Sequence, residues 1–146
     1  MNIDYSPYIE RLRSLGLRPT KQRLTICKVL FDRPKTFHFT IEQLKKIIDQ
    51  DLKNKISLAT LYNTIHAFKK NGHLKEISLK GNKSFFDTNV KNHHHFYDED
   101  KSELIDIGEK YILLNKIPEV PSGKKIKDIE VTVSIATDNQ IQKKTI

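Results

Sequence analysis

Residues 57–87 read SLATLYNTIHAFKKNGHLKEISLKGNKSFFD, and this stretch decides the fold. Its first half predicts a helix between a cap at Ser57 and a stop at Gly72, with a buried stripe at helical spacing: Leu58, Leu61, Ile65 and Phe68. After Gly72 the period becomes that of a strand, and Lys80–Lys83 contains the Gly and Asn of a hairpin turn. A helix followed by a basic hairpin predicts the recognition helix and wing of a winged helix-turn-helix.

Three further helices are expected upstream. The first begins at Ser6 and ends at Gly16, and the second runs from Thr20 to just before Arg33. The third follows a capping box at Thr40, with a buried stripe of Leu44, Ile47 and Ile48. An ordinary helical bundle with an appended hairpin is the alternative, but the helix order and the lysines of the hairpin favour a DNA-binding winged helix.

The C-terminal part changes character. Strands are expected at 104–107 and 129–135, and 111–114 is a possible helix that ends before the Pro-rich segment 117–123. So few elements form a thin core, so we expect dimerisation through a shared sheet. The predicted fold class is α+β, with a winged-helix DNA-binding domain over 1–88, a hinge at 89–92 and a small α/β dimerisation domain over 93–146.

The net charge also differs between the N-terminal and C-terminal parts of the chain. Residues 1–90 contain 17 Lys and Arg against 8 Asp and Glu, a net +9, whereas residues 91–146 contain 9 against 10, a net −1. A polyanion, most simply double-stranded DNA, would therefore meet the N-terminal part. The alternative is that the excess lysines only keep a small protein soluble.

Composition limits the other possibilities. The chain has no apolar run of about 18 residues and no signal-peptide layout, which predicts a cytoplasmic protein. The single cysteine, Cys27, lies at helical spacing from Leu24 and Phe31, which favours a buried core thiol over a nucleophile. One cysteine also permits neither a disulfide within the chain nor a cysteine-built zinc site.

Three of the six histidines are consecutive, at His93, His94 and His95. In an extended segment His93 and His95 share one face and His94 points to the other. Imidazole is the commonest protein ligand for metals, and carboxylates are available at Asp87 and Asp106. A solvated polar loop is the alternative that the run alone leaves open.

Three motifs then carry a resemblance: GLRPTKQR at 16–23, HFTIEQL at 38–44 and ISLATLYNT at 56–64, followed by the His run. In this order and spacing they resemble the ferric uptake regulator family, over residues 10 to about 108. The resemblance implies a dimeric, metal-responsive transcription factor with a winged helix and an α/β dimerisation domain. The segment 93–107 most resembles the iron response regulator branch, which implies a repressor that controls iron and haem metabolism and responds to haem.

The resemblance also implies a regulatory metal site. Its five ligands are carried over to His38, Asp87, His93, His95 and Asp106. Imidazole nitrogens and carboxylate oxygens suit Fe(II), Mn(II) or Zn(II). An ion held by His38 from one domain and by the later ligands from the other would restrict the spacing of the recognition helices.

The chain departs from the family pattern at two places. Asp98 and Lys101 stand where many relatives carry a Cys-x-x-Cys pair, so no Cys-based structural zinc is expected. A second family site near the dimer interface retains only His94. The cysteine-proline haem motif is missing as well, so any haem would have to use His93, His94 and His95.

For DNA, the winged-helix resemblance implies two groups of contacts. Thr60, Tyr62 and Asn63 are expected in the major groove, and the phosphate contacts are expected from Lys21, Arg23, Ser57, Lys80 and Lys83. Two alternatives remain open. A metal-dependent hydrolase is disfavoured because five candidate ligands leave little room for the open coordination position that catalysis needs. The other alternative is a peroxide- or other-metal-sensing regulator of the same family, and in a peroxide sensor the iron-catalysed oxidation of a ligand histidine would end DNA binding.

Overall fold

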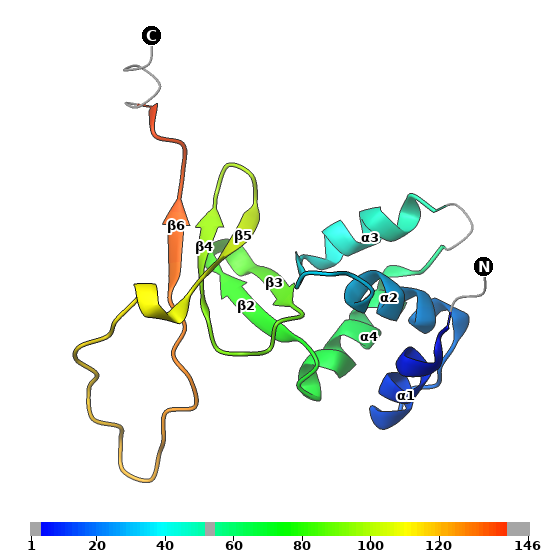
Figure 1. The fold of residues 1–146 in the computed structure, drawn as a ribbon, viewed down its shortest axis with the longest axis horizontal. Helices are drawn as coiled ribbons and strands as arrows, with labels where there is room; N and C mark the ends of the chain where they lie inside the picture. Colours follow the sequence, from blue (N-terminus) through cyan, green and yellow to red (C-terminus); the bar gives the residue numbers. More distant parts are fainter. Residues whose placement is uncertain (1–3, 52–54, 140–146) are drawn as a thin grey trace. The chain divides into compact units, whose positions relative to one another are not determined.

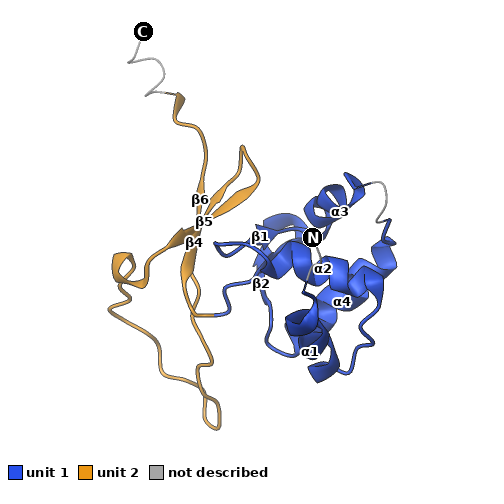
Figure 2. Ribbon diagram, turned by 45° about the vertical axis from the view of Figure 1, so that its right-hand side comes forward, with its two compact units in different colours: residues 1–90 blue, residues 91–146 orange. Residues whose placement is uncertain are grey.

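The computed structural model describes residues 4–51 and 55–139. The chain divides into two compact units, residues 1–90 and 91–146, shown in blue and orange in Figure 2. Each unit has its own three-stranded sheet. The α+β class expected from the sequence is confirmed, with the helices of Figure 1 concentrated in the first unit.

Four helices form most of the first unit: α1 (Ser6–Ser14), α2 (Lys21–Phe31), α3 (Ile41–Asp49) and α4 (Leu58–Lys70). Three of them begin where the sequence places a capping side chain. The hydroxyls of Thr20, Thr40 and Ser57 accept hydrogen bonds from backbone N–H groups of the first turns of α2, α3 and α4. At Thr40 the capping box is complete, because the Gln43 side chain also accepts from the Thr40 N–H at 3.0 Å.

The sheet of the first unit has the order β1-β3-β2, with all pairs antiparallel. The wing is formed by β2 (Lys75–Leu79) and β3 (Lys83–Asp87), joined by the one-turn 3-10 segment η1 (Lys80–Asn82). Gly81 and Asn82 both have positive φ, 76° and 59°, which explains why this turn requires Gly and Asn. The short strand β1 (His38–Phe39) adds to β3 on its other side.

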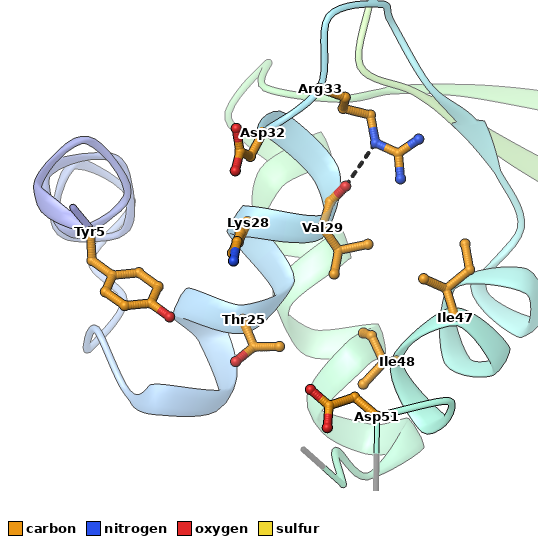
Figure 3. Close-up of a pocket in the computed structure, with 9 residues that line it drawn as sticks. All are labelled: Tyr5, Thr25, Lys28, Val29, Asp32, Arg33, Ile47, Ile48 and Asp51. Carbon is orange, nitrogen blue, oxygen red and sulfur yellow. Dashed lines mark hydrogen bonds between the residues drawn. The ribbon is translucent and has the colours of Figure 1, made fainter. Parts of the chain in front are cut away.

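Two apolar residues expected in the core lie at the surface. Leu58 is 45% exposed, because it occupies the first helical position of α4 and the core-facing side of that helix begins at Leu61. Thr64 takes an unpredicted core position, where its hydroxyl donates to the Thr60 carbonyl at 2.8 Å. Ile47 is 37% exposed because it lines a hollow beside α2 and α3 that also borders Val29 and Ile48 (Figure 3).

The second unit has a sheet of order β5-β4-β6, built from β4 (His94–Asp98), β5 (Glu103–Ile107) and β6 (Thr132–Ile135). Strands β4 and β5 are antiparallel, whereas β4 and β6 are parallel. The helix considered at 111–114 is wrong: the 3-10 segment η2 ends at Tyr111, and described residues 112–131 form the long loop in yellow and orange in Figure 1. The expected strand at 129–135 begins only at Thr132.

The last residues of the predicted dimerisation domain are not described by the structure. The predicted dimerisation domain extends to residue 146, and its last seven residues lie outside the described range. Within the described part of the chain, no helix has the length and apolar character needed to cross a bilayer.

Candidate metal centre and nucleic-acid interface

The first unit brings together one imidazole and one carboxylate. His38 on β1 and Asp87 at the end of β3 are direct cross-strand partners, and His38 Nε2 lies 3.1 Å from Asp87 Oδ2. The other carboxylate oxygen, Oδ1, accepts the Asn89 N–H at 2.8 Å. Asp87 is fully buried, so this carboxylate is held by backbone and imidazole groups in a fixed orientation.

The second unit brings together two imidazoles and one carboxylate. His95 and Asp106 are cross-strand partners on β4 and β5, and His93 precedes His95 by two residues on the same face. Oδ1 of Asp106 lies 3.1 Å from His93 Nε2 and 3.3 Å from His95 Nε2. The two rings are 4.3 Å apart between centroids, so three donor atoms converge within this unit alone.

The backbone sets the tautomer of His93. Its Nδ1 lies 2.6 Å from the Lys91 carbonyl oxygen, which can only accept, so Nδ1 carries the hydrogen. In the neutral ring the lone pair is then on Nε2, the atom that faces the Asp106 carboxylate. Two electron-rich atoms at 3.1 Å repel each other unless a cation or a proton lies between them, so this arrangement is suited to a bound metal ion.

His94 has a different role. Its Nδ1 accepts the Val131 N–H at 2.9 Å and so ties β4 to the segment just before β6. Because Nδ1 is the acceptor, the neutral ring carries its hydrogen on Nε2. Neither nitrogen can therefore ligate a metal or a haem iron while this bond persists.

The predicted groove residues lie on the outer side of α4. Tyr62 is 37% exposed, Asn63 is exposed and Thr60 is half-buried. Thr60 is partly engaged in the helix cap, because its hydroxyl is 2.9 Å from that of Ser57. Sequence reasoning missed the neighbour of Tyr62 on this face, His66, whose ring lies 6.0 Å from the Tyr62 ring at an interplanar angle of 20°.

The predicted phosphate contacts are distributed over the same unit. Lys80 and Lys83 are exposed at the tip of the wing, and Lys21 is exposed at the start of α2. Arg23 is half-buried, and its Nη1 donates to the Arg18 carbonyl at 3.0 Å, so part of its guanidinium is committed to the protein. Lys83 is therefore the cleaner probe of a phosphate contact.

Carboxylates hold the hairpin turn between β4 and β5, where Asp98 and Lys101 lie. Asp98 Oδ1 accepts the N–H groups of Asp100 and Lys101, at 3.0 and 3.1 Å. Asp100 Oδ2 in turn accepts both the N–H and the hydroxyl of Thr137 beyond β6, at 2.6 Å each, and these bonds lower the Asp100 pKa. Elsewhere, Cys27 is a core thiol whose pKa is raised to about 12 by burial, so it is not poised as a nucleophile.

Comparisons with known proteins agree with this architecture. A model of the ferric uptake regulator family matches residues 14–135. The peroxide-responsive repressor PerR of Staphylococcus aureus (strain Mu50) is 33% identical over 124 residues, which cover 85% of this chain and 79% of the relative. Two solved structures have the same fold as this chain.

The ferric uptake regulator of Vibrio cholerae has a TM-score of 0.69 at 24% identity, and the match covers 89% of this chain and 99% of the other. The ferric uptake regulator of Pseudomonas aeruginosa, solved with manganese, has a TM-score of 0.63 at 20% identity and covers 89% and 97%.

Proposed function

Because the chain belongs to the ferric uptake regulator family, we propose that it is an iron-responsive transcription regulator that represses genes of iron and haem metabolism. Members of this family are metal-responsive, DNA-binding regulators that act as dimers, and the expectation that the chain is not an enzyme is confirmed. The iron signal, the iron response regulator branch and the repressed genes are the specific content of the proposal. We place its action in the cytoplasm, where operator DNA is available.

One observation carries the metal-dependent part. His93, His95 and Asp106 converge within a single unit, and the Lys91 carbonyl orients the lone pair of His93 toward the shared carboxylate. An antiparallel strand pair positions His95 and Asp106, and the Lys91 carbonyl fixes the His93 ring beside them, so little ordering is required when an ion binds. A solvated polar loop, the alternative left open by the sequence, would not need this arrangement.

We propose that His38 and Asp87 complete the same site. They form a matching donor pair at the end of the wing, in the unit that carries the recognition helix. Three imidazoles and two carboxylates make a mixed nitrogen and oxygen set, which suits Fe(II), Mn(II) or Zn(II). When bound, the ion supplies a cross-link between the DNA-binding domain (1–88) and the dimerisation domain (93–146), on either side of the hinge at 89–92.

The consequence for DNA follows from the geometry of duplexes. A dimer of winged helices reads two half-sites about 34 Å apart, or at a related spacing along the groove. Restricting the two recognition helices before they meet DNA lowers the ordering cost of binding. Tyr62, Thr60 and Asn63 would contact base edges. The phosphate contacts would come from Lys21, Arg23, Ser57, Lys80 and Lys83.

In this proposal the regulator responds to haem as well as to the divalent metal ion. Of the three candidate haem ligands, His93 and His95 are the metal donors, so haem ligation by either would compete with the metal ion. His94 would first have to release the Val131 N–H. We therefore propose that haem weakens DNA binding by removing His93 or His95 from the metal.

A titration of operator DNA tests both parts. Untagged, metal-free protein is used to select operators from a duplex library in the presence of Mn(II), and the selected duplex is then titrated with apo protein, with Mn(II) and with Mn(II) plus haem. We expect the tightest binding with Mn(II) and weaker binding in the other two states. Equal affinity in all three states would refute the metal and haem response, whereas selection of no sequence at all would refute the DNA-binding function.

The 33% identity to a peroxide-responsive repressor favours a second candidate, in which peroxide would oxidise a ligand histidine, His38 or His93, when the site holds Fe(II). Mass spectrometry distinguishes the two. Protein loaded with Fe(II) and treated with peroxide is compared with protein loaded with Mn(II). A gain of one oxygen atom on His38 or His93 that requires Fe(II) and abolishes DNA binding would support the peroxide sensor over the iron regulator.

A further inference from the structure

We propose that His66 is a second specificity-determining residue of α4, which acts with Tyr62 as a two-ring element that reads adjacent base pairs. The inference rests on the proposed function, because it requires that the outer side of α4 enters the major groove. It adds a residue that the sequence analysis did not assign to DNA.

The two rings form a pair on the surface of one helix. Tyr62 and His66 are four residues apart, so they are neighbours on the same side of α4. Their centroids are 6.0 Å apart and their planes differ by only 20°, an offset parallel arrangement. The imidazole therefore limits the positions open to the Tyr62 ring, while both side chains remain open to solvent.

The position of His66 along the helix fits the width of the groove. The exposed residues Ala59, Asn63 and His66 follow one another at helical spacing, with Tyr62 beside them. Seven residues of α-helix rise about 10 Å. A B-DNA major groove is about 12 Å wide, so a helix whose N-terminal turn contacts base edges keeps the next two turns within reach of the groove.

Lysines, rather than His66, supply the positive charge on this part of α4. The Glu76 carboxylate on β2 accepts a hydrogen bond from Lys69, and this bond is the main cause that lowers the Glu76 pKa. Lys69 is paired with this carboxylate, so the pair cancels its own charge beside the imidazole. Lys70 is the remaining cation on the next turn. Lys70 is therefore the candidate phosphate contact on this turn, which leaves His66 to contact a base edge.

The chemistry of the two rings is complementary. The phenol ring of Tyr62 offers apolar surface, which suits the methyl group of thymine. The imidazole of His66 offers an N–H donor, and the N7 atom of a purine is an acceptor on the floor of the major groove. We expect the pair to prefer a thymine next to a purine, with His66 selecting the purine.

Three substitutions at one position separate reading from ring packing. His66→Phe keeps an aromatic ring beside Tyr62 but has no hydrogen-bonding group, His66→Asn keeps a donor without the ring, and His66→Ala has neither. Each variant and the wild type select duplexes from the same randomised library with Mn(II) present. Circular dichroism melting of each variant confirms that the fold is kept, and Lys70→Ala serves as a matched control on the same helix.

We expect His66→Phe and His66→Ala to lose about five- to tenfold of discrimination at one base pair in each half-site, and His66→Asn to keep a preference there. Lys70→Ala should weaken binding equally for all sequences. If both His66→Phe and His66→Ala select the wild-type sequences with wild-type discrimination, the inference is overturned while the proposed function stands. If the wild type itself selects no sequence, the proposed function fails and the inference fails with it.

Discussion

Replacing Asp106 with Asn tests the metal centre most directly, because the change should have opposite effects on the two states of the protein. In the apo protein the Asp106 carboxylate faces the nitrogens of two imidazoles at 3.1 and 3.3 Å. An amide of the same shape removes the negative charge and offers an N–H to those nitrogens. We therefore expect the metal-free Asp106→Asn variant to be at least as stable as the wild type.

The metal-bound state should lose most of its extra stability. An ion present at one hundred times its dissociation constant stabilises the folded protein by about 2.7 kcal/mol. Even the loss of an outer-shell partner of a metal ligand lowers affinity by about 10- to 100-fold, and Asp106 is a proposed direct ligand. At 100-fold weaker affinity the same ion concentration contributes only about 0.4 kcal/mol. The difference of about 2.3 kcal/mol corresponds to roughly 5–9 °C in Tm for a chain of this size.

The assay is thermal unfolding of wild type and variant, with chelator and with a Mn(II) series. Glu103→Gln is a matched control, because Glu103 lies on the same strand at a position that alternation directs to the opposite face from Asp106. The control should keep the full metal-dependent rise in Tm. A Mn(II)-dependent rise in Asp106→Asn equal to that of the wild type would remove Asp106 from the metal site.

Lys83→Ala should weaken binding to all duplexes and reduce the salt slope by about 1, whereas Tyr62→Ala should change discrimination between sites, both measured by fluorescence anisotropy over a salt series. His94→Ala should lower the free energy of unfolding by about 1 kcal/mol, because it removes the acceptor of the Val131 N–H, yet it should leave the Mn(II) response unchanged. The His73 pKa is lowered from 6.5 by burial and by the Arg11 charge, so the unfolded chain binds the proton more readily. Stability should therefore fall as pH drops below about 6.5, and urea midpoints of His73→Gln should show a weaker pH dependence.

The helical part of the fold is largely predictable because its signals are local. Three helices begin at a capping hydroxyl that bonds a backbone N–H three residues further on, and the sequence shows these caps directly. The expected capping bond forms at Thr20, Thr40 and Ser57. The local pattern does not show which other element, if any, will cover each apolar side chain. Leu58 and Ile47 have the correct periodicity but reach positions where no other element covers them, so both stay exposed among the described residues.

The second unit is less predictable for the same reason. The apolar run at 111–114 is too short to distinguish a helix from other structures, and the described loop 112–131 keeps much of its apolar surface exposed, with Leu113 at 78%. Long-range pairing decides this region: β4 pairs in parallel with β6, which lies more than thirty residues later in the chain. The shared sheet that we expect in a dimer remains a prediction.

In the metal centre, the sequence predicts which residues come together but not which ring nitrogen of each histidine can bind a ligand. Period two places His93 and His95 together, opposite Asp106, but it cannot tell which nitrogen of each ring is available. Two main-chain groups make that distinction. The Lys91 carbonyl turns the lone pair of His93 toward the carboxylate, and the Val131 N–H occupies the lone pair of His94.

Three identical side chains in a row therefore differ in their capacity to bind a ligand, and this constrains how haem can act. A haem that recruits His94 must break a strand-to-strand hydrogen bond, so its binding should loosen the attachment of β6. A haem that recruits His93 or His95 instead competes only with the metal ion and should leave β6 protected from hydrogen exchange. Hydrogen exchange at residues 131–135, measured in the apo protein, with Mn(II) and with haem, distinguishes these routes, because the first predicts faster exchange with haem than in the apo protein and the second does not.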